Sequence, residues 1–180
     1  GVFAGAPLTI YRKPEAKGWG DTFGGRPVKL ISEKPQEAVS NPNLNYEIKG
    51  DAVTITDCYK NASGALTIPA TIEGKLVTSI GTAAFSKCSS LTSITIPDGV
   101  TSIGASAFSK CTSITSVTIG DSVTSIGNAA FGLTSLEIII IPENVKMMGD
   151  GVFLKCSNLE RVIFNGDAPK LGVPAMQYSG

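Results

Sequence analysis

The chain has 180 residues, of which 42% are hydrophobic, so it is long enough to bury one substantial core and differs from disordered sequences. Fifteen lysine and arginine residues balance fifteen aspartates and glutamates, which leaves no basic excess to hold a phosphate backbone and predicts no nucleic-acid partner. No apolar run approaches the roughly 18 residues of a membrane-spanning helix, so we expect no membrane span.

Residues 1–31 contain short strand and turn signals. The segment Leu8–Tyr11 predicts a strand, and the glycine-rich, aromatic segment 18–27 predicts a turn-rich stretch. Residues 32–45 are polar and contain two prolines, which predicts a linker.

The next segment, residues 46–61, is predicted to begin with a β-hairpin. Apolar and polar residues alternate on both sides of Lys49-Gly50-Asp51, and that triplet supplies a turn. We expect this hairpin to cap the N-terminal end of the array that follows, because it would shield the first core layer and its strand edges.

A repeat of 22 to 23 residues follows over residues 62–169. Its most regular mark is a phenylalanine, with spacings of 23, 23 and 22 residues between Phe85, Phe108, Phe131 and Phe153. Each full copy contains a pattern such as Leu91-x-x-Ile94-x-Ile96, whose period of two predicts one strand with its isoleucines inward. A single copy cannot cover its apolar face alone, so the copies must stack, with the phenylalanine rings in the core.

Glycines and one irregular copy mark the turns between these strands. Gly104, Gly127 and Gly149 follow the second apolar pattern of their copies, and we expect them to supply turn conformations that other residues resist. In the third copy, we interpret Phe131-Gly132-Leu133 as one residue short and without the cysteine of its neighbours, which leaves the register of that turn open.

The combined pattern, Leu-x-x-Ile-x-Ile-Pro-x-x-Val-x-x-Ile-Gly-x-x-Ala-Phe-x-x-Cys, resembles the BspA-like leucine-rich repeat, also called the Treponema pallidum type. The resemblance implies a β-rich leucine-rich-repeat solenoid with short turns or helical pieces and about four to five repeats of 22–23 residues. Residues 1–31 resemble the segment that closes the C-terminal end of such arrays, although here they precede the array. Residues 170–180 are interpreted as a C-terminal tail.

An array without its closing segment exposes strand edges and its last core layer, which favours self-association through the ends. We therefore expect residues 1–31 to dock on the end around Leu159–Phe164, either of a neighbouring chain or of the same chain. Docking on a neighbouring chain is preferred because it needs no segment running back along the solenoid.

The sequence indicates no catalytic, cofactor or metal site. The chain has no histidine, which excludes Ser-His-Asp and Cys-His arrangements, and its cysteines form no C-x-x-C pair. Asp98 and Asp121 occupy matching turns, where capping of the backbone is favoured over binding of an ion. Gly24-Gly25-Arg26 lacks the strand, turn and helix context of a phosphate site. We therefore expect a protein that is not an enzyme.

Three of the four cysteines, Cys88, Cys111 and Cys156, occupy the same position of their repeats, and the fourth is Cys58. Buried free thiols are the favoured interpretation. A disulfide between neighbouring repeats is the alternative, because stacked turns can bring Cα atoms within the separation that a disulfide needs.

The candidate binding face consists of the outward positions on the stacked strands. There are two such positions on each strand: Ser93, Thr95, Ser116, Thr118, Ile138, Ile140, Arg161 and Ile163. The first four are small and polar, whereas the three isoleucines would expose an apolar cluster, and such a cluster tends to mark a contact surface. Coverage of this cluster by another part of the chain is the alternative.

The resemblance implies a secreted or cell-surface protein whose repeat face binds a protein or host-matrix ligand. A structural spacer between domains is one alternative. A carbohydrate-binding module is another, in which Tyr11 and Trp19 stack on a sugar ring instead of packing within their own segment.

Overall fold

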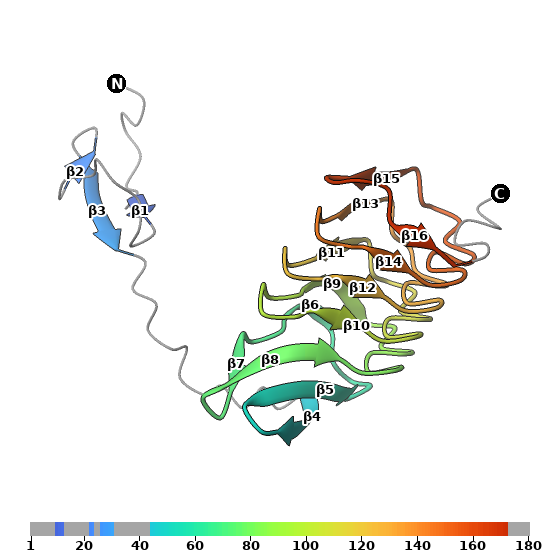
Figure 1. Ribbon diagram of the computed structural model, residues 1–180, viewed down its shortest axis with the longest axis horizontal. Helices are drawn as coiled ribbons and strands as arrows, with labels where there is room; N and C mark the ends of the chain where they lie inside the picture. The colour runs from blue at the N-terminus through green and yellow to red at the C-terminus, as the bar shows by residue number, and fades with distance from the viewer. Residues whose placement is uncertain (1–9, 13–21, 24–25, 31–43, 173–180) are drawn as a thin grey trace. The chain divides into compact units, whose positions relative to one another are not determined.

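The computed structural model describes residues 10–12, 22–23, 26–30 and 44–172 (Figure 1). Within these ranges the chain forms strands and turns and no helix, so short turns alone connect the repeats. Accordingly, the described residues include no helix long and apolar enough to cross a membrane. The chain divides into two compact units, Gly1–Glu37 and Ala38–Gly180.

The first unit contains three short strands. β1 (Ile10–Arg12) pairs in parallel with β3 (Arg26–Leu30), and β2 (Thr22–Phe23) pairs with β3 in antiparallel fashion. Trp19, Gly24-Gly25, most of the expected linker and residues 173–180 lie outside the described residues. The interpretation of residues 1–31 as a cap stays a prediction.

The second unit is a solenoid whose coils each add one strand to each of two ladders (Figure 1). The continuous ladder runs from β4 to β16 and contains β4 (Leu44–Lys49), β5 (Ala52–Cys58), β8 (Lys75–Ile80), β10 (Ser102–Ile103), β12 (Ser125–Ile126), β14 (Met147–Met148) and β16 (Lys170–Leu171), with β7 (Thr71–Ile72) paired to β8. The other ladder is divided into two sheets: β6 (Gly64–Thr67), β9 (Leu91–Thr95) and β11 (Ser116–Thr118), then β13 (Ile138–Ile141) and β15 (Arg161–Phe164).

The first strands of the solenoid form a hairpin. β4 and β5 pair in antiparallel fashion around a turn in which Gly50 has a φ of +63°. β5 then pairs in parallel with β8, with Val53 beside Val77, so the hairpin is continuous with the first coil. Val53 and Ile55 are fully buried and belong to the same core as the repeats.

The phenylalanines form a stack along the solenoid axis. The ring centroids of Phe85 and Phe108 are 5.0 Å apart, those of Phe108 and Phe131 are 5.3 Å apart, and Phe153 follows at 6.1 Å. The first three rings are completely buried, and inward residues of both ladders surround them. The predicted stacking of phenylalanines in the core is therefore confirmed.

The turns that carry these rings repeat an unusual backbone conformation. Positive φ angles occur two residues before and two residues after each phenylalanine, at Ala83, Lys87, Ser106, Lys110, Ala129, Leu133, Gly151 and Lys155. Backbone hydrogen bonds join equivalent turns, as from Phe85 N–H to Ala107 O and from Phe108 N–H to Ala130 O, each at 2.7 Å. This ladder of bonds fixes every turn to the next and determines the register of the repeats.

The irregular third repeat is shortened at a different place from the one expected. Leu133 has the same left-handed conformation as Lys87 and Lys110, so the turn around Phe131 has its full length. Thr134 occupies the cysteine position, where its hydroxyl donates to Phe131 O at 2.8 Å and lies 3.3 Å from the Cys156 sulfur. The missing residue therefore lies between Thr134 and Leu136, and the interpretation of Phe131-Gly132-Leu133 as the shortened segment was wrong.

The expected role of the glycines after the short strands was also wrong. Gly104, Gly127 and Gly149 do not have positive φ angles. A Cβ atom on Gly104 would lie 2.6 Å from Gly81 C, and one on Gly127 would lie 2.5 Å from Ala105 N. These positions require glycine because the backbone of the preceding coil passes too close for any side chain.

Candidate functional site

The candidate binding face lies on the divided ladder. Ser93 pairs with Ser116 and Thr95 with Thr118 across β9 and β11, whereas Ile138 pairs with Arg161 and Ile140 with Ile163 across β13 and β15. Ile140 is 49% exposed and Ile163 is 41% exposed, while Ile138 is only partly exposed. The two exposed isoleucines are thus direct neighbours on the last two strands of this ladder.

The two halves of this face are separate sheets. β6, β9 and β11 are hydrogen-bonded in sequence, and so are β13 and β15. Within residues 44–172, no backbone hydrogen bond joins β11 to β13. The break coincides with the shortened connection between Thr134 and Leu136. This connection places β13 one residue closer to the preceding turn than the other strands of the ladder are to theirs.

A hollow of about 360 Å³ lies at this break, and we call it the strand-face hollow. Its lining residues are Ser116, Val117, Thr118, Ile119, Asp121, Ile138, Ile140, Pro142 and Asn165. Four of the eight predicted face residues line it, namely Ser116, Thr118, Ile138 and Ile140. Sequence reasoning did not place Asp121, Pro142 and Asn165 beside them, since these residues follow the strands in the next turns.

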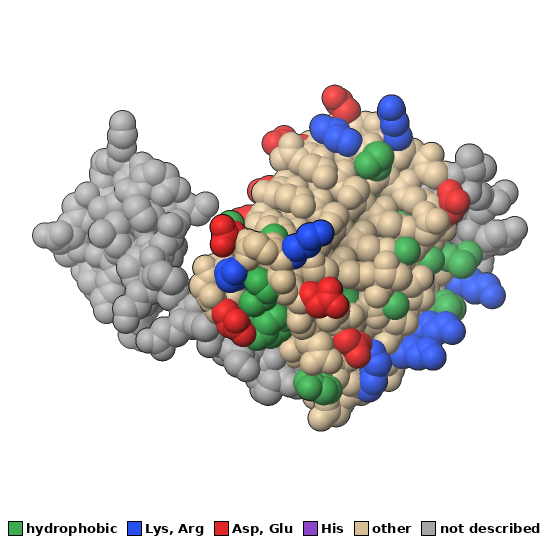
Figure 2. All heavy atoms as spheres, turned by 60° about the horizontal axis from the view of Figure 1, so that its bottom comes forward, with side chains coloured by type: hydrophobic (Ala, Val, Ile, Leu, Met, Phe, Trp, Pro, Cys, Tyr) green, Lys and Arg blue, Asp and Glu red, His purple; other side chains and the backbone are tan. Residues whose placement is uncertain are grey.

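Charges are separated across the solenoid although the chain has no net charge. The turns after the divided ladder carry exposed carboxylates in successive coils, at Asp98, Asp121, Glu143 and Asp167. The turns that hold the phenylalanines carry exposed lysines, at Lys87, Lys110 and Lys155, and Lys60 is exposed in the turn that follows β5. Figure 2 shows lysines following one another along one edge of the array and acidic side chains along the opposite edge. Comparing outward positions between repeats would have revealed both rows.

The matching aspartates stabilise the turns between coils. Asp98 Oδ1 accepts a hydrogen bond from the Asp121 N–H at 3.3 Å, and Asp121 O accepts one from Asn144 Nδ2 at 2.9 Å. Asp98 therefore binds the backbone of the next coil and not that of its own turn. Among the described residues, no group of three or more potential ligands could hold a metal ion.

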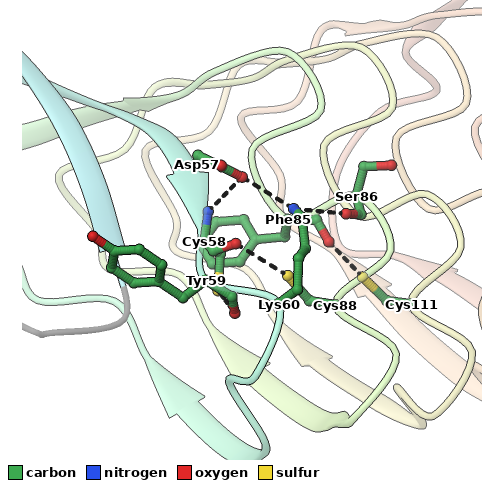
Figure 3. Close-up of polar contacts among 8 residues, drawn as sticks. All are labelled: Asp57, Cys58, Tyr59, Lys60, Phe85, Ser86, Cys88 and Cys111. Atoms are coloured by element: carbon green, nitrogen blue, oxygen red, sulfur yellow. Dashed lines mark hydrogen bonds and ion pairs between the residues drawn. The ribbon is translucent and has the colours of Figure 1, made fainter.

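Buried cysteines form a second feature, and Figure 3 shows three of them, Cys58, Cys88 and Cys111, at the N-terminal end of the array. All four are free thiols, as favoured from the sequence. The Cys111 thiol donates to Phe85 O at 2.9 Å, and the Cys156 thiol donates to Phe131 O at 3.0 Å. Cys88 differs because its sulfur lies 3.7 Å from Cys58 O, so two cysteines meet where the hairpin joins the repeats.

The first two cysteines have different acidities. The pKa of the Cys88 thiol is lowered to about 7, mainly because hydrogen bonding with the Cys58 side chain favours the Cys88 thiolate, and the nearby Lys60 ammonium lowers it further against the effect of burial. The same bond and burial raise the pKa of Cys58. Burial raises the pKa of Cys111 to about 12. Lys60 is held in place by Asp57 at 3.0 Å and by Ser86 O at 3.0 Å.

Cys88 and Cys111 are both completely buried, so alkylation of either needs local opening of the fold, and the lower pKa of Cys88 predicts that it is modified first. The thiolate is the reactive form, and its fraction at Cys88 rises as the pH increases through about 7, whereas Cys111 stays protonated until about pH 12. Iodoacetamide labelling of the folded chain between pH 6 and 8, followed by peptide mass spectrometry, measures this order. Lys60→Met should slow labelling of Cys88 at pH 7 and have little effect at pH 9. Faster labelling of Cys111 than of Cys88 would contradict the assignment.

Comparisons with known proteins agree with the repeat architecture. The family model described as BspA type Leucine rich repeat region matches residues 57–179. A leucine-rich repeat protein from Bacteroides capillosus is similar in structure, with a TM-score of 0.60 and 31% identity over 69% of this chain and 95% of that protein. No curated protein sequence matches the chain.

Two further structures resemble the solenoid at lower sequence identity. The Treponema pallidum leucine-rich repeat protein has a TM-score of 0.53 and 23% identity over 73% of this chain and 84% of that protein. A leucine-rich cell surface protein from Faecalibacterium prausnitzii has a TM-score of 0.62 and 23% identity, over 78% of this chain and 42% of that protein. These two likenesses concern the fold alone.

Proposed function

Because the chain belongs to the BspA-type leucine-rich repeat family, we propose that it is a non-catalytic module that binds a protein through the candidate binding face. Solenoids of this kind generally present extended surfaces to partners. The observation that carries the proposal is the exposed pair Ile140 and Ile163 beside the strand-face hollow, since exposed apolar clusters mark contact sites.

We also propose that the module belongs to a larger secreted or cell-surface protein. Charged residues make up only 17% of the chain, and small hydroxyl residues occupy many outward positions, such as Ser93, Thr95, Ser116 and Thr118. This composition supports an extracellular setting. The polar strands β9 and β11 favour the spacer function as the alternative, in which the solenoid only separates neighbouring domains.

Removing the apolar cluster tests the binding function. Ile138→Ser combined with Ile140→Thr is expected to leave the free energy of unfolding nearly unchanged, because Ile139 and Ile141 already supply the core contacts of β13. Self-association and binding to immobilised extracellular-matrix proteins should weaken by about tenfold, equivalent to ~1.4 kcal/mol. Biolayer interferometry and sedimentation velocity measure these two properties.

Leu76→Ser is the matched control, because Leu76 is 55% exposed but lies on β8 of the other ladder. It should leave binding unchanged. Unfolding of the double variant would show that Ile138 and Ile140 are core residues. Equal binding by the wild type and the double variant, with every tested partner, would favour the spacer function.

A further inference from the structure

At the strand-face hollow, strand edges are exposed. Elsewhere in the solenoid, the backbone groups on such edges are hydrogen-bonded to the neighbouring coil. Elsewhere in this ladder, neighbouring coils are bonded, as from Ile96 N–H to Thr118 O at 2.9 Å and from Asn165 N–H to Ile141 O at 3.0 Å. Between β11 and β13 such bonds are absent within residues 44–172. The facing edges therefore offer backbone N–H and C=O groups to a ligand or to water.

The walls of the hollow differ in chemistry. Ile138, Ile140 and Pro142 supply apolar surface, while the hydroxyls of Ser116 and Thr118 supply acceptors. Asp121 and Asn165 add a carboxylate and an amide. A volume of about 360 Å³ lies at the lower end of the range of ligand pockets, which suits one long side chain.

The only carboxylate among the lining residues belongs to Asp121. Its own backbone is fixed by the bonds to Asp98 and Asn144, but within residues 44–172 its carboxylate has no hydrogen-bond or ion-pair partner. Asp98, Glu143 and Asp167 continue the acidic row on the same edge of the solenoid. Their combined field favours a cation in the hollow over an anion.

Few cations oppose this field near the hollow. Arg161 is exposed beside Ile138 on β15, but it does not line the hollow. Lys146 Nζ donates to Glu143 O at 3.1 Å, and the lysine row lies in the turns around the phenylalanines. The lining residues themselves include no lysine or arginine.

We propose that the strand-face hollow binds an arginine side chain of a partner protein. An arginine combines an apolar stem, which fits Ile138, Ile140 and Pro142, with a planar cation that has five N–H donors. The guanidinium pairs with the Asp121 carboxylate, and its remaining donors meet the hydroxyls and the exposed carbonyl groups. Lysine fits less well because its three donors radiate from one point. This inference rests on the proposed binding function and names the group that anchors the partner.

Titration with N-acetyl-arginine amide, followed by NMR of the isotope-labelled full chain, tests the proposal. The amide signals of Thr118, Asp121 and Ile140 are expected to shift and saturate, with a Kd on the order of millimolar for so small a probe. Asp121→Asn should weaken binding at least tenfold. Asp167→Asn is the matched control, because Asp167 belongs to the same acidic row but neither lines the hollow nor bonds to Asp121, and it should change the Kd less than twofold.

Two further probes, titrated against the wild-type chain, test whether binding needs the positive charge and the planar shape of the guanidinium. N-acetyl-citrulline amide, which keeps the shape but lacks the charge, should bind at least tenfold more weakly, and N-acetyl-lysine amide should also bind more weakly. Absence of saturable shifts at the hollow would overturn the proposal, and so would equal effects of the two aspartate substitutions. The proposal would also fail if the citrulline or the lysine probe bound as tightly as the arginine probe.

Failure of this inference is separable from failure of the proposed function. If the arginine probe does not bind but the substitutions at Ile138 and Ile140 still weaken partner binding, the arginine assignment alone is wrong. If the probe binds as expected but partner binding survives those substitutions, the binding function of the face is wrong.

Discussion

Replacing Phe108 by alanine is expected to lower the free energy of unfolding by about 3 to 5 kcal/mol, the range typical of large-to-small changes in a core. The Phe108 ring is completely buried and stacks between Phe85 at 5.0 Å and Phe131 at 5.3 Å. Its loss leaves a cavity that the surrounding coils cannot close, because backbone hydrogen bonds fix each turn to the next. Urea titration monitored by circular dichroism measures the change.

Tyr59→Ala provides the comparison, since it also removes an aromatic ring but from a residue that is 50% exposed. Its cost should stay below about 1 kcal/mol, as for most surface substitutions. A loss below about 1 kcal/mol for Phe108→Ala would show that this ring contributes little to the core. The stack, and the repeat register inferred from it, would then have to be revised.

The solenoid was predictable because its apolar residues recur at a regular spacing. The spacing of Phe85, Phe108, Phe131 and Phe153 specifies one ring per coil, and the structure stacks all four. The alternation around Ile94 and Ile96 specifies one strand per coil, and both residues are buried. Both patterns reflect burial, which a periodic sequence expresses directly.

The features that the sequence did not predict depend on contacts between coils. Glycine at position 127 allows either a left-handed backbone or a close approach, and only the neighbouring coil shows that the approach is the reason. Thr134 occupies the cysteine position but bonds differently, because its hydroxyl donates to Phe131 O of its own coil, whereas Cys111 and Cys156 donate to a phenylalanine carbonyl of the preceding coil. A pattern defined by cysteine does not show this substitution.

The strand-face hollow was unpredictable for a related reason. The sequence shows that the third repeat is one residue short, but it does not show which hydrogen bonds are lost. The structure assigns the loss to the pairing of β11 with β13, which opens the hollow beside residues already expected on the face. Asp121 lines it only because the turn after β11 lies next to β13 and Pro142.

The close approach of neighbouring coils leads to a second large expected effect. Gly127→Ala should lower the free energy of unfolding by about 1 to 3 kcal/mol, as overpacking of a rigid interior does. The new Cβ would lie 2.5 Å from Ala105 N and 2.7 Å from Gly104 C, and both are backbone atoms. The coils cannot separate freely, because Gly127 N–H donates to Ile103 O at 2.8 Å.

Gly99→Ala isolates this effect, because Gly99 also lacks a positive φ and its Cβ would approach only Val77 O, at 3.1 Å. Both substitutions restrict the unfolded chain in the same way, by about 0.4 to 1 kcal/mol in favour of folding, so this contribution cancels in the comparison. Urea titration should therefore show a clear loss for Gly127→Ala and a change within about 1 kcal/mol for Gly99→Ala. Equal changes at the two positions would mean that the coils adjust to a side chain at position 127. The contact between adjacent coils would then not be what requires glycine there.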